Sequence, residues 1–336
     1  MQNLKSRLIL SIVFALVVFV ALTFYADAPR LLSALAKFDW RFLPFALVTT
    51  VVNYLLRFVR WHYYLDVIGV KNVPRRDSLL IFLSGFSLTV TPGKLGEVLK
   101  SVLLRTRYGT PVSYSASIVF AERLTDVLGV VILAAAGLVF YPVGIGALIA
   151  VLVITFLFVV VVQQRALAET ILDRIARTPK VGRFADLARN LYESAYLMLR
   201  AKPLVIAIGL ATAAWFGECL TFFIVLLGIG LAPTLLLLLQ ATFIYAAASL
   251  FGAVSMLPGG LGATEGGMAL LLQQIVGVAR EEAVASTLIV RLCTLWLAVL
   301  LGGLALLIFG RLKGKTDLGA SITGEKIRST DNPPNA

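Results

Sequence analysis

Charged side chains lie inside stretches of the sequence that are otherwise apolar, and their spacing suggests a binding site. Asn53, Arg57 and Arg60 are separated by four and three residues, so they fall on one face of a helix. Two neighbouring guanidinium groups can grip a phosphate through paired hydrogen bonds. The pattern therefore predicts recognition of an anionic headgroup. For Arg60 the alternative, that it only reaches out to the membrane surface, stays open.

A second group of charges combines both signs. Glu122 and Asp126 are four residues apart with Arg123 between them, so one acid can pair with this arginine while the other needs a partner elsewhere. Glu218 and Arg291 each stand alone in an apolar run. An ionised group at the centre of a bilayer costs on the order of 2.5 to 3.5 kcal/mol, so each needs a partner, a cavity or a function. Internal ion pairing is the alternative to substrate binding here.

Two apolar stretches are broken by proline and glycine and then carry an acid. Residues 92–97 read Pro-Gly-Lys-Leu-Gly-Glu, and residues 258–265 read Pro-Gly-Gly-Leu-Gly-Ala-Thr-Glu. Helix starts after such breaks present free N–H groups to an anion. The first break has basic flanks and the second does not, which predicts two re-entrant hairpins entering from opposite faces. Such an inverted repeat is typical of transporters, although a chance match is the alternative.

The elements that position these residues are predicted to be membrane helices. Of the 336 residues 59% are hydrophobic and 14% charged, with a mean hydropathy of +0.92, whereas soluble domains have roughly 25% charged residues. A span needs about 20 apolar residues. We therefore predict an all-α integral membrane protein with about six full spans plus the two hairpins. The apolar runs are 8–25, 42–65, 114–140, 146–162, 203–228, 235–256 and 283–310.

Basic residues in short loops mark the cytoplasmic side of a membrane. The net charge of +12 is therefore interpreted as loop bias, not as nucleic-acid binding. Lys5 and Arg7 place the N-terminus in the cytoplasm, and the first apolar run is interpreted as an uncleaved span. We expect the cytoplasmic (inner) membrane of a prokaryote, with both termini inside.

The predicted division of the chain is a membrane domain over 1–310 and a disordered cytoplasmic tail over 311–336. The hairpins are placed at about 78–104 and 235–275, around the two Pro-Gly breaks. The basic loop 163–202 is predicted to be the main cytoplasmic loop. Part of it forms an amphipathic helix on the membrane surface or, equally, a solvated connector.

Several kinds of chemistry are poorly supported. His62 is the only histidine, both cysteines (Cys219 and Cys293) lie in apolar runs, and no P-loop occurs. These features argue against a serine hydrolase, a metal site and ATP-driven transport, and we expect no cofactor. The candidate substrate-binding residues are Arg57, Arg60, Lys94, Glu97, Glu122, Arg123, Asp126, Glu218, Glu265 and Arg291, and the candidate break residues are Pro92, Gly93, Gly96, Pro258, Gly259, Gly260 and Gly262.

In this order the motifs resemble the integral-membrane, flippase-like region that precedes the catalytic domain of lysylphosphatidylglycerol synthases, over about residues 8–310. The resemblance rests on Asn53-x3-Arg57-x2-Arg60-Trp61, Glu122-Arg123-x2-Asp126 and the two Pro-Gly breaks. It implies movement of an aminoacylated phosphatidylglycerol, or of a polyprenyl-linked or other anionic lipid, between leaflets. The synthases' transferase domain would need roughly two domain lengths. Because only 26 residues follow Gly310, we do not expect this chain to make lysylphosphatidylglycerol.

The leading hypothesis is therefore a lipid transporter in which the headgroup sits between the hairpins and the repeats alternate access, with Glu97 and Glu265 carrying protons. One alternative is a membrane-embedded transferase using Glu97, Glu122 or Asp126 as general base. Another is a non-catalytic partner of a separate lipid-modifying enzyme. Expected partners are membrane lipids with an anionic headgroup; a homo-oligomer stays open, and no nucleic acid is expected.

Overall fold

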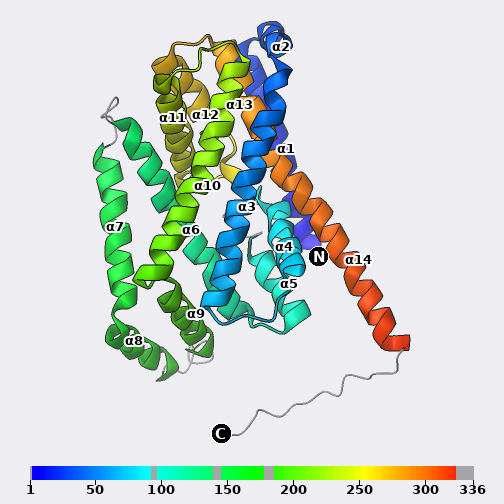
Figure 1. Ribbon diagram of the computed structural model, residues 1–336, viewed down its shortest axis with the longest axis vertical. Helices are drawn as coiled ribbons and strands as arrows, with labels where there is room; N and C mark the ends of the chain where they lie inside the picture. Colours follow the sequence, from blue (N-terminus) through cyan, green and yellow to red (C-terminus); the bar gives the residue numbers. More distant parts are fainter. Residues whose placement is uncertain (1, 92–96, 139–144, 178–184, 323–336) are drawn as a thin grey trace.

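The computed structural model describes residues 2–91, 97–138, 145–177 and 185–322. Within these ranges every regular element is a helix, which confirms the predicted all-α class (Figure 1). The α-helices are α1 (Gln2–Ala26), α2 (Ala28–Lys37), α3 (Leu43–Val67), α4 (Arg75–Ser84), α5 (Val98–Tyr108), α6 (Val112–Leu138), α7 (Ile145–Gln163), α8 (Arg165–Arg177), α9 (Ala185–Met198), α10 (Ala201–Gly228), α11 (Leu235–Val254), α12 (Ala263–Leu271), α13 (Arg280–Arg291) and α14 (Leu297–Ile322). Short 3-10 helices lie at Trp40–Phe42, Gly85–Leu88 and Pro258–Gly260, and π-helical turns at Leu272–Val276 and Leu292–Trp296.

Within the described residues, four helical segments are long and apolar enough to cross a bilayer: Trp40–Val67, Ala201–Gly228, Leu235–Val254 and Arg280–Arg311. Two further pairs are bent, α1 with α2 by 93° and α7 with α8 by 72°. Counting each pair as one span gives six, the predicted number, but the set differs: it includes α11, which was predicted as part of a hairpin, and omits α6, which was predicted as a span. Helix α6 does not meet this criterion because every 18-residue stretch of it contains Glu122, Arg123 and Asp126.

Helix α3 has two distinct faces. Val51, Val52 and Leu55 are 43 to 50% exposed, whereas Asn53 and Arg60 are buried. Apolar side chains turned outward and polar ones turned inward are the arrangement expected of a helix that faces lipid on one side. The polar face packs against α10, which also contacts α6 and α11. Helix α10 therefore joins the elements that carry the charges.

The two broken segments occupy opposite halves of the molecule. Helices α4 and α5, called the first hairpin, lie side by side in the lower half of Figure 1, and α11 and α12, the second hairpin, in the upper half. The second break contacts the segment that follows α4 between these halves, where a Cβ atom on Gly259 would lie 3.4 Å from the Cα of Val90. The hairpins thus approach one another from opposite ends. Their origin as an inverted repeat stays a prediction.

The second break depends on glycine. Gly259, Gly260 and Gly262 have φ angles of 61°, 69° and 84°, a region in which only glycine is unstrained. Glu265 then stabilises the start of α12, because its Oε2 accepts a hydrogen bond from the Gly262 N–H at 2.7 Å. The break is therefore built into the local sequence. Residues 92–96 of the first break lie outside the described residues.

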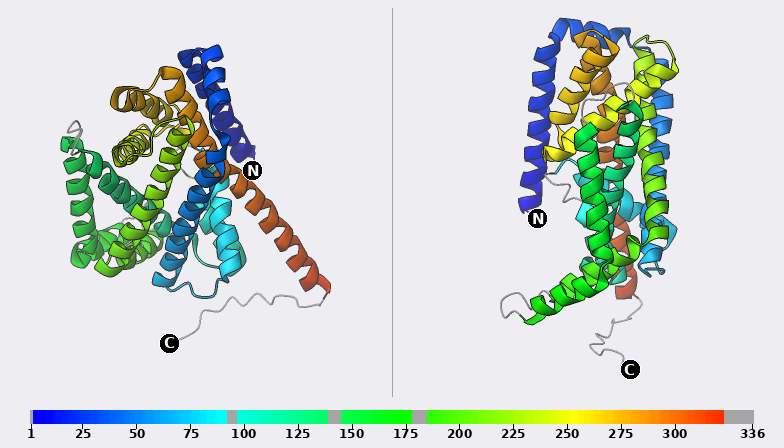
Figure 2. Two further views of the ribbon diagram at one scale, coloured as in Figure 1. Left: turned by 45° about the horizontal axis from the view of Figure 1, so that its top comes forward. Right: turned by 90° about the vertical axis from the view of Figure 1, so that its left-hand side faces the viewer.

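The predicted boundaries need one correction. Helix α14 continues to Ile322, so the disordered tail predicted from residue 311 is wrong as far as 322; residues 323–336 lie outside the described ones. The basic loop 163–202 contains α8 and α9, which extend to one side of the body in the right-hand view of Figure 2. Helix α9 packs against α6. Contact of this loop with a membrane surface stays a prediction.

Candidate functional site

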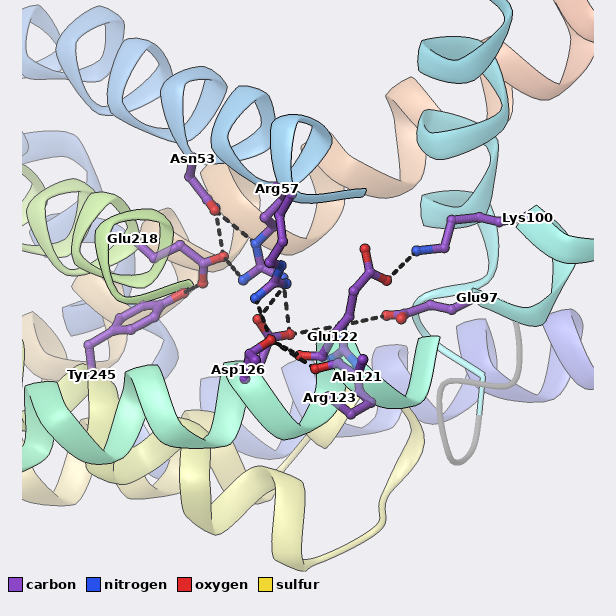
Figure 3. Close-up of polar contacts among 12 residues, drawn as sticks. Asn53, Arg57, Glu97, Lys100, Ala121, Glu122, Arg123, Asp126, Glu218 and Tyr245 are labelled. Carbon is purple, nitrogen blue, oxygen red and sulfur yellow. Dashed lines mark hydrogen bonds and ion pairs between the residues drawn. The ribbon is translucent and has the colours of Figure 1, made fainter. Parts of the chain in front are cut away.

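Asp126 is the centre of a network of buried charges, drawn in Figure 3. Its Oδ1 accepts a hydrogen bond from Nη2 of Arg60 at 2.7 Å. Its Oδ2 lies 2.9 Å from Nη2 of Arg123 and 3.9 Å from Nη1 of Arg57. One carboxylate on α6 thus links its own helix to both arginines of α3. This arrangement explains why three arginines are tolerated close together in an apolar bundle.

Glu218 on α10 is a second centre. Its Oε1 accepts hydrogen bonds from Nδ2 of Asn53 at 2.7 Å and from Nη2 of Arg57 at 2.9 Å. Its Oε2 accepts one from the hydroxyl of Tyr245 on α11 at 2.6 Å. The guanidinium of Arg57 also lies over the ring of Trp215, 4.8 Å from its centre. Three helices therefore meet at one carboxylate.

Helix α5 connects to the network through two residues one turn apart. Lys100 lies 2.5 Å from Oε2 of Glu122 and 4.6 Å from the centre of the Trp61 ring. Glu97 lies 3.0 Å from Nη2 of Arg123. In Figure 3 these contacts stand on the opposite side of Asp126 from Glu218 and Tyr245. The first hairpin is thus tied to α6 by two ion pairs.

The second hairpin is held in the same manner. Nε of Arg291 on α13 lies 2.5 Å from Oε1 of Glu265, and its Nη2 donates to the carbonyl oxygen of Gly259 at 3.1 Å. Glu265 is completely buried. One arginine therefore fixes both the start of α12 and the backbone of the break.

The charges of this site balance within the described residues. The cations Arg57, Arg60, Lys100, Arg123 and Arg291 all face one or more of the anions Glu97, Glu122, Asp126, Glu218 and Glu265. An anionic ligand that binds one of these five cations therefore competes with a carboxylate. Arg123 is the most accessible cation, with a side chain 30% exposed.

Two cavities border the network. The central cavity, about 260 Å³, is lined by Arg123 and Asp126 of α6, Tyr245 of α11 and the second break, among others. The side cavity, about 100 Å³, is lined by Arg57, by Phe86 and Thr89 of the first hairpin, and by Glu97. Both share the residues Trp215, Glu218, Gly259 and Arg291. These four residues therefore border both cavities. In the described part of the chain no group of three His, Cys, Asp or Glu side chains is placed to hold a metal ion.

Comparison with known proteins identifies the architecture. The profile of the family described as the lysylphosphatidylglycerol synthase TM region matches residues 8–302. The chain belongs to this family. Among its relatives is a UPF0104 membrane protein of Pyrococcus horikoshii, 24% identical over 89% of this chain and 96% of its own. A UPF0104 membrane protein of Methanothermobacter thermautotrophicus is 24% identical over 91% of this chain and 94% of its own.

The residues predicted from the sequence are largely brought together in the structure. Arg57, Arg123, Asp126, Glu218 and Arg291 line one or both cavities, and the breaks at Gly259 and Gly260 close the central one. Arg60 is 1% exposed and bound to Asp126, so the alternative that it reaches the membrane surface is wrong. Lys94, Pro92, Gly93 and Gly96 lie outside the described residues.

Three members of the network were not predicted. Lys100 follows Glu97 by one helical turn, a spacing that could have indicated it. Trp215 precedes Glu218 by three residues and lies on the same side of α10. Tyr245 stands in an otherwise apolar helix, and no local signal marks it. A buried tyrosine hydroxyl needs a partner, but the sequence does not say which one.

Proposed function

We propose that this membrane protein moves an anionic or polyprenyl-linked lipid between the leaflets of the cytoplasmic membrane by alternating access. The observation that carries the proposal is the balanced charge network between two opposed broken hairpins, next to a cavity. Transporters built from broken helices bind their substrates at such positions near the midplane. The headgroup occupies the central cavity while the acyl chains stay in the bilayer.

The rim of the central cavity supports access from the side. Met256 and Leu257 line the cavity, and they are 74% and 38% exposed. Phe251 and Val254, just before them on α11, are 61% and 79% exposed. A polar interior with an apolar outer rim suits a molecule with a charged head and apolar tails. The head does not have to enter the apolar bilayer, and the tails do not have to enter the polar cavity.

Arg123 is the group that receives the phosphate. Its Nη2 lies 3.0 Å from Glu97 and 2.9 Å from Asp126, and its side chain lines the central cavity. A phosphate oxygen takes the place of the Glu97 carboxylate, which accepts a proton so that the site stays neutral. Binding of the lipid and uptake of a proton are then one event, which couples transport to a proton gradient.

The residues that border both cavities form the gate. Arg57, which lines the side cavity, is joined to Glu218, and Arg291 to Gly259 of the second break. Opening these contacts connects the central cavity on the second hairpin with the side cavity on the first. Because the two hairpins lie in opposite halves of the molecule, each cavity serves one side of the membrane.

The transferase alternative has less support from this geometry. A general base needs free access to a substrate proton. Asp126 is engaged by Arg60 and Arg123, and Glu97 by Arg123. Glu122 is paired with Lys100 away from the central cavity.

The test is transport in proteoliposomes. We would measure the rate at which a fluorescent phosphatidylglycerol, or a fluorescent polyprenyl phosphate, in the inner leaflet becomes accessible to an impermeant quencher. The double variant Arg123→Gln with Glu97→Gln neutralises one ion pair without leaving a lone buried charge. The expected result is a loss of at least roughly tenfold in rate, the effect of losing one charge-assisted contact.

The matched control is the exposed pair Arg165 with Glu193, joined at 3.2 Å between α8 and α9. Replacing both by glutamine removes the same charges far from the cavities and should leave the rate unchanged. Equal rates for wild type, the Arg123 double variant and this control would overturn the assignment of the headgroup site. If no protein, wild type included, transferred lipid faster than empty liposomes do, the proposal of lipid transport would be overturned.

A further inference from the structure

A groove between α1 and α12 lies outside the charge network. It has a volume of about 300 Å³ and is lined by Val18, Ala21, Leu22 and Tyr25 of α1, by Gly262 of the second break, and by Gly266, Ala269 and Leu270 of α12. Except for the Tyr25 hydroxyl, every lining side chain is apolar. Gly266 leaves room there, since a Cβ atom on it would meet nothing within 4 Å.

Polar groups gather at one end of this groove. Gln273, one turn beyond Ala269, donates to the Tyr25 hydroxyl at 3.3 Å. The guanidinium of Arg280 lies 4.8 Å from the centre of the Tyr25 ring and donates to the Tyr25 carbonyl oxygen at 3.4 Å. Among the described residues no carboxylate lies within 4.0 Å of this guanidinium. Its charge is thus available to a ligand.

The bend of the chain and the residue types at this end of the groove favour a position near a membrane surface. The chain turns by 93° at Asp27, two residues after Tyr25, so α2 runs across the end of α1 (Figure 1). Tyrosine and arginine are the residues that usually anchor a protein at the bilayer interface. From Tyr25 to Val18 the wall of α1 runs inward for seven residues, or about 10 Å.

We propose that the groove binds one phospholipid, with an acyl chain between α1 and α12 and its phosphate at Arg280. The chain buries its apolar surface against Leu22, Ala269 and Leu270, and the phosphodiester supplies the anion that Arg280 lacks. A second copy of the protein is a less suitable occupant, because the groove is narrow and ends at a lone cation. This lipid is a resident one and is not the transported lipid.

The position of the groove gives the resident lipid a role. Gly262 lines the groove, and its N–H is bound by Glu265, which is paired with Arg291 at the central cavity. The outer face of the second break is thus in contact with the lipid chain, and its inner face with the charge network. A bound lipid stabilises the start of α12.

The test uses the full-length protein purified in detergent and depleted of lipid. Every protein in it carries Arg123→Gln and Glu97→Gln, so that the proposed headgroup site retains no second lipid, and wild type here means an unaltered groove. Phosphatidylglycerol is added, and two quantities are measured: the rise in Tm and the number of lipids retained in native mass spectrometry. For the unaltered groove we expect a saturable rise in Tm and one retained lipid, since ligands that bind only the folded state stabilise it. Diacylglycerol, which lacks the phosphate, should give a much smaller rise.

Three variants separate the parts of the site. Gly266→Leu fills the groove from α12 and Ala21→Phe fills it from α1, and both should abolish the rise in Tm and the retained lipid. Arg280→Gln should raise the apparent Kd for phosphatidylglycerol by roughly tenfold. Gly209→Leu is the control, because Gly209 on α10 also has open space at its Cβ position but lies away from the groove.

The proposal would be overturned if the folded Gly266→Leu or Ala21→Phe protein still retained one lipid and showed the wild-type rise in Tm. Equal effects of phosphatidylglycerol and diacylglycerol would also overturn it. The test does not depend on transport: if the native protein transports lipid but the unaltered groove gives no saturable rise in Tm, the groove site alone is disproved.

Discussion

Arg291 lies 2.5 Å from the carboxylate of Glu265, whose other oxygen binds the N–H of Gly262. A single carboxylate therefore joins α13, the start of α12 and the second break. The same arginine donates to Gly259, so the tip of the second hairpin is held by one side chain. The conformation of this tip depends on a buried charge interaction.

Glu265→Gln is expected to destabilise the protein strongly. The amide can still accept the hydrogen bond of Gly262, but it leaves the buried charge of Arg291 without a counter-charge, which costs about 3–5 kcal/mol. Thermal unfolding in detergent should show a large fall in Tm. The double variant Glu265→Gln with Arg291→Met removes both charges and should recover most of the loss. A single variant as stable as wild type would contradict the ion pair.

Asp126→Asn should be the most damaging neutralisation in the network. It removes the carboxylate that faces Arg60, Arg123 and, at 3.9 Å, Arg57. We expect a loss of about 3–5 kcal/mol, seen as a lower Tm and a lower yield of folded protein. Asp173→Asn is the control: it breaks the exposed pair with Arg189 and should leave the Tm unchanged. Equal effects of the two substitutions would argue against a buried network.

Tyr245→Phe removes one hydroxyl from the Glu218 site and nothing else. A hydrogen bond to a charged group contributes about 1.5–3 kcal/mol, so a moderate fall in Tm is expected. Because Asn53 and Arg57 still hold the other oxygen of Glu218, the protein should remain folded. Comparison with Tyr63→Phe, near the C-terminal end of α3 and away from Glu218, checks that the loss comes from this contact; an equal fall in both would refute it.

Gly302→Ala tests the contact between α14 and the first hairpin. A Cβ atom on Gly302 would lie 2.2 Å from the backbone nitrogen of Ser87, which cannot move aside as a side chain can. Overpacking of this kind costs about 1–3 kcal/mol. Gly303→Ala should be neutral or stabilising, since its Cβ position is open. The difference in Tm between these neighbours is the quantity to measure.

Much of the membrane fold could be predicted from the sequence, because apolar runs, basic loops and Pro-Gly breaks are local signals. The apolar run 203–228 corresponds to α10, and 42–65 to α3. The bend at Asp27 and the short helix α2 were not predicted, because a ten-residue amphipathic helix is too short to give a clear periodic pattern.

The site was harder to predict because its contacts join residues far apart in the chain. The cost of burying a charge predicted that Glu218 and Arg291 need partners. It did not predict that these partners are Arg57 and Glu265. The prediction that one acid of α6 would pair with Arg123 is confirmed for Asp126, and Glu122 has its partner in Lys100. The equal number of cations and anions in the network also could not be predicted from the sequence. It means that an anionic ligand competes with the carboxylates of the network.

The most direct test of the account is to fill the central cavity without touching a charge. Ser249 of α11 lines this cavity, and Ser249→Trp would occupy much of its 260 Å³. Val205→Trp, at a 68% exposed position of α10, is the control. With both proteins folded in proteoliposomes, the account predicts that the rate of phosphatidylglycerol or polyprenyl phosphate transfer falls by at least roughly tenfold only for Ser249→Trp. Wild-type rates in the filled protein would contradict it.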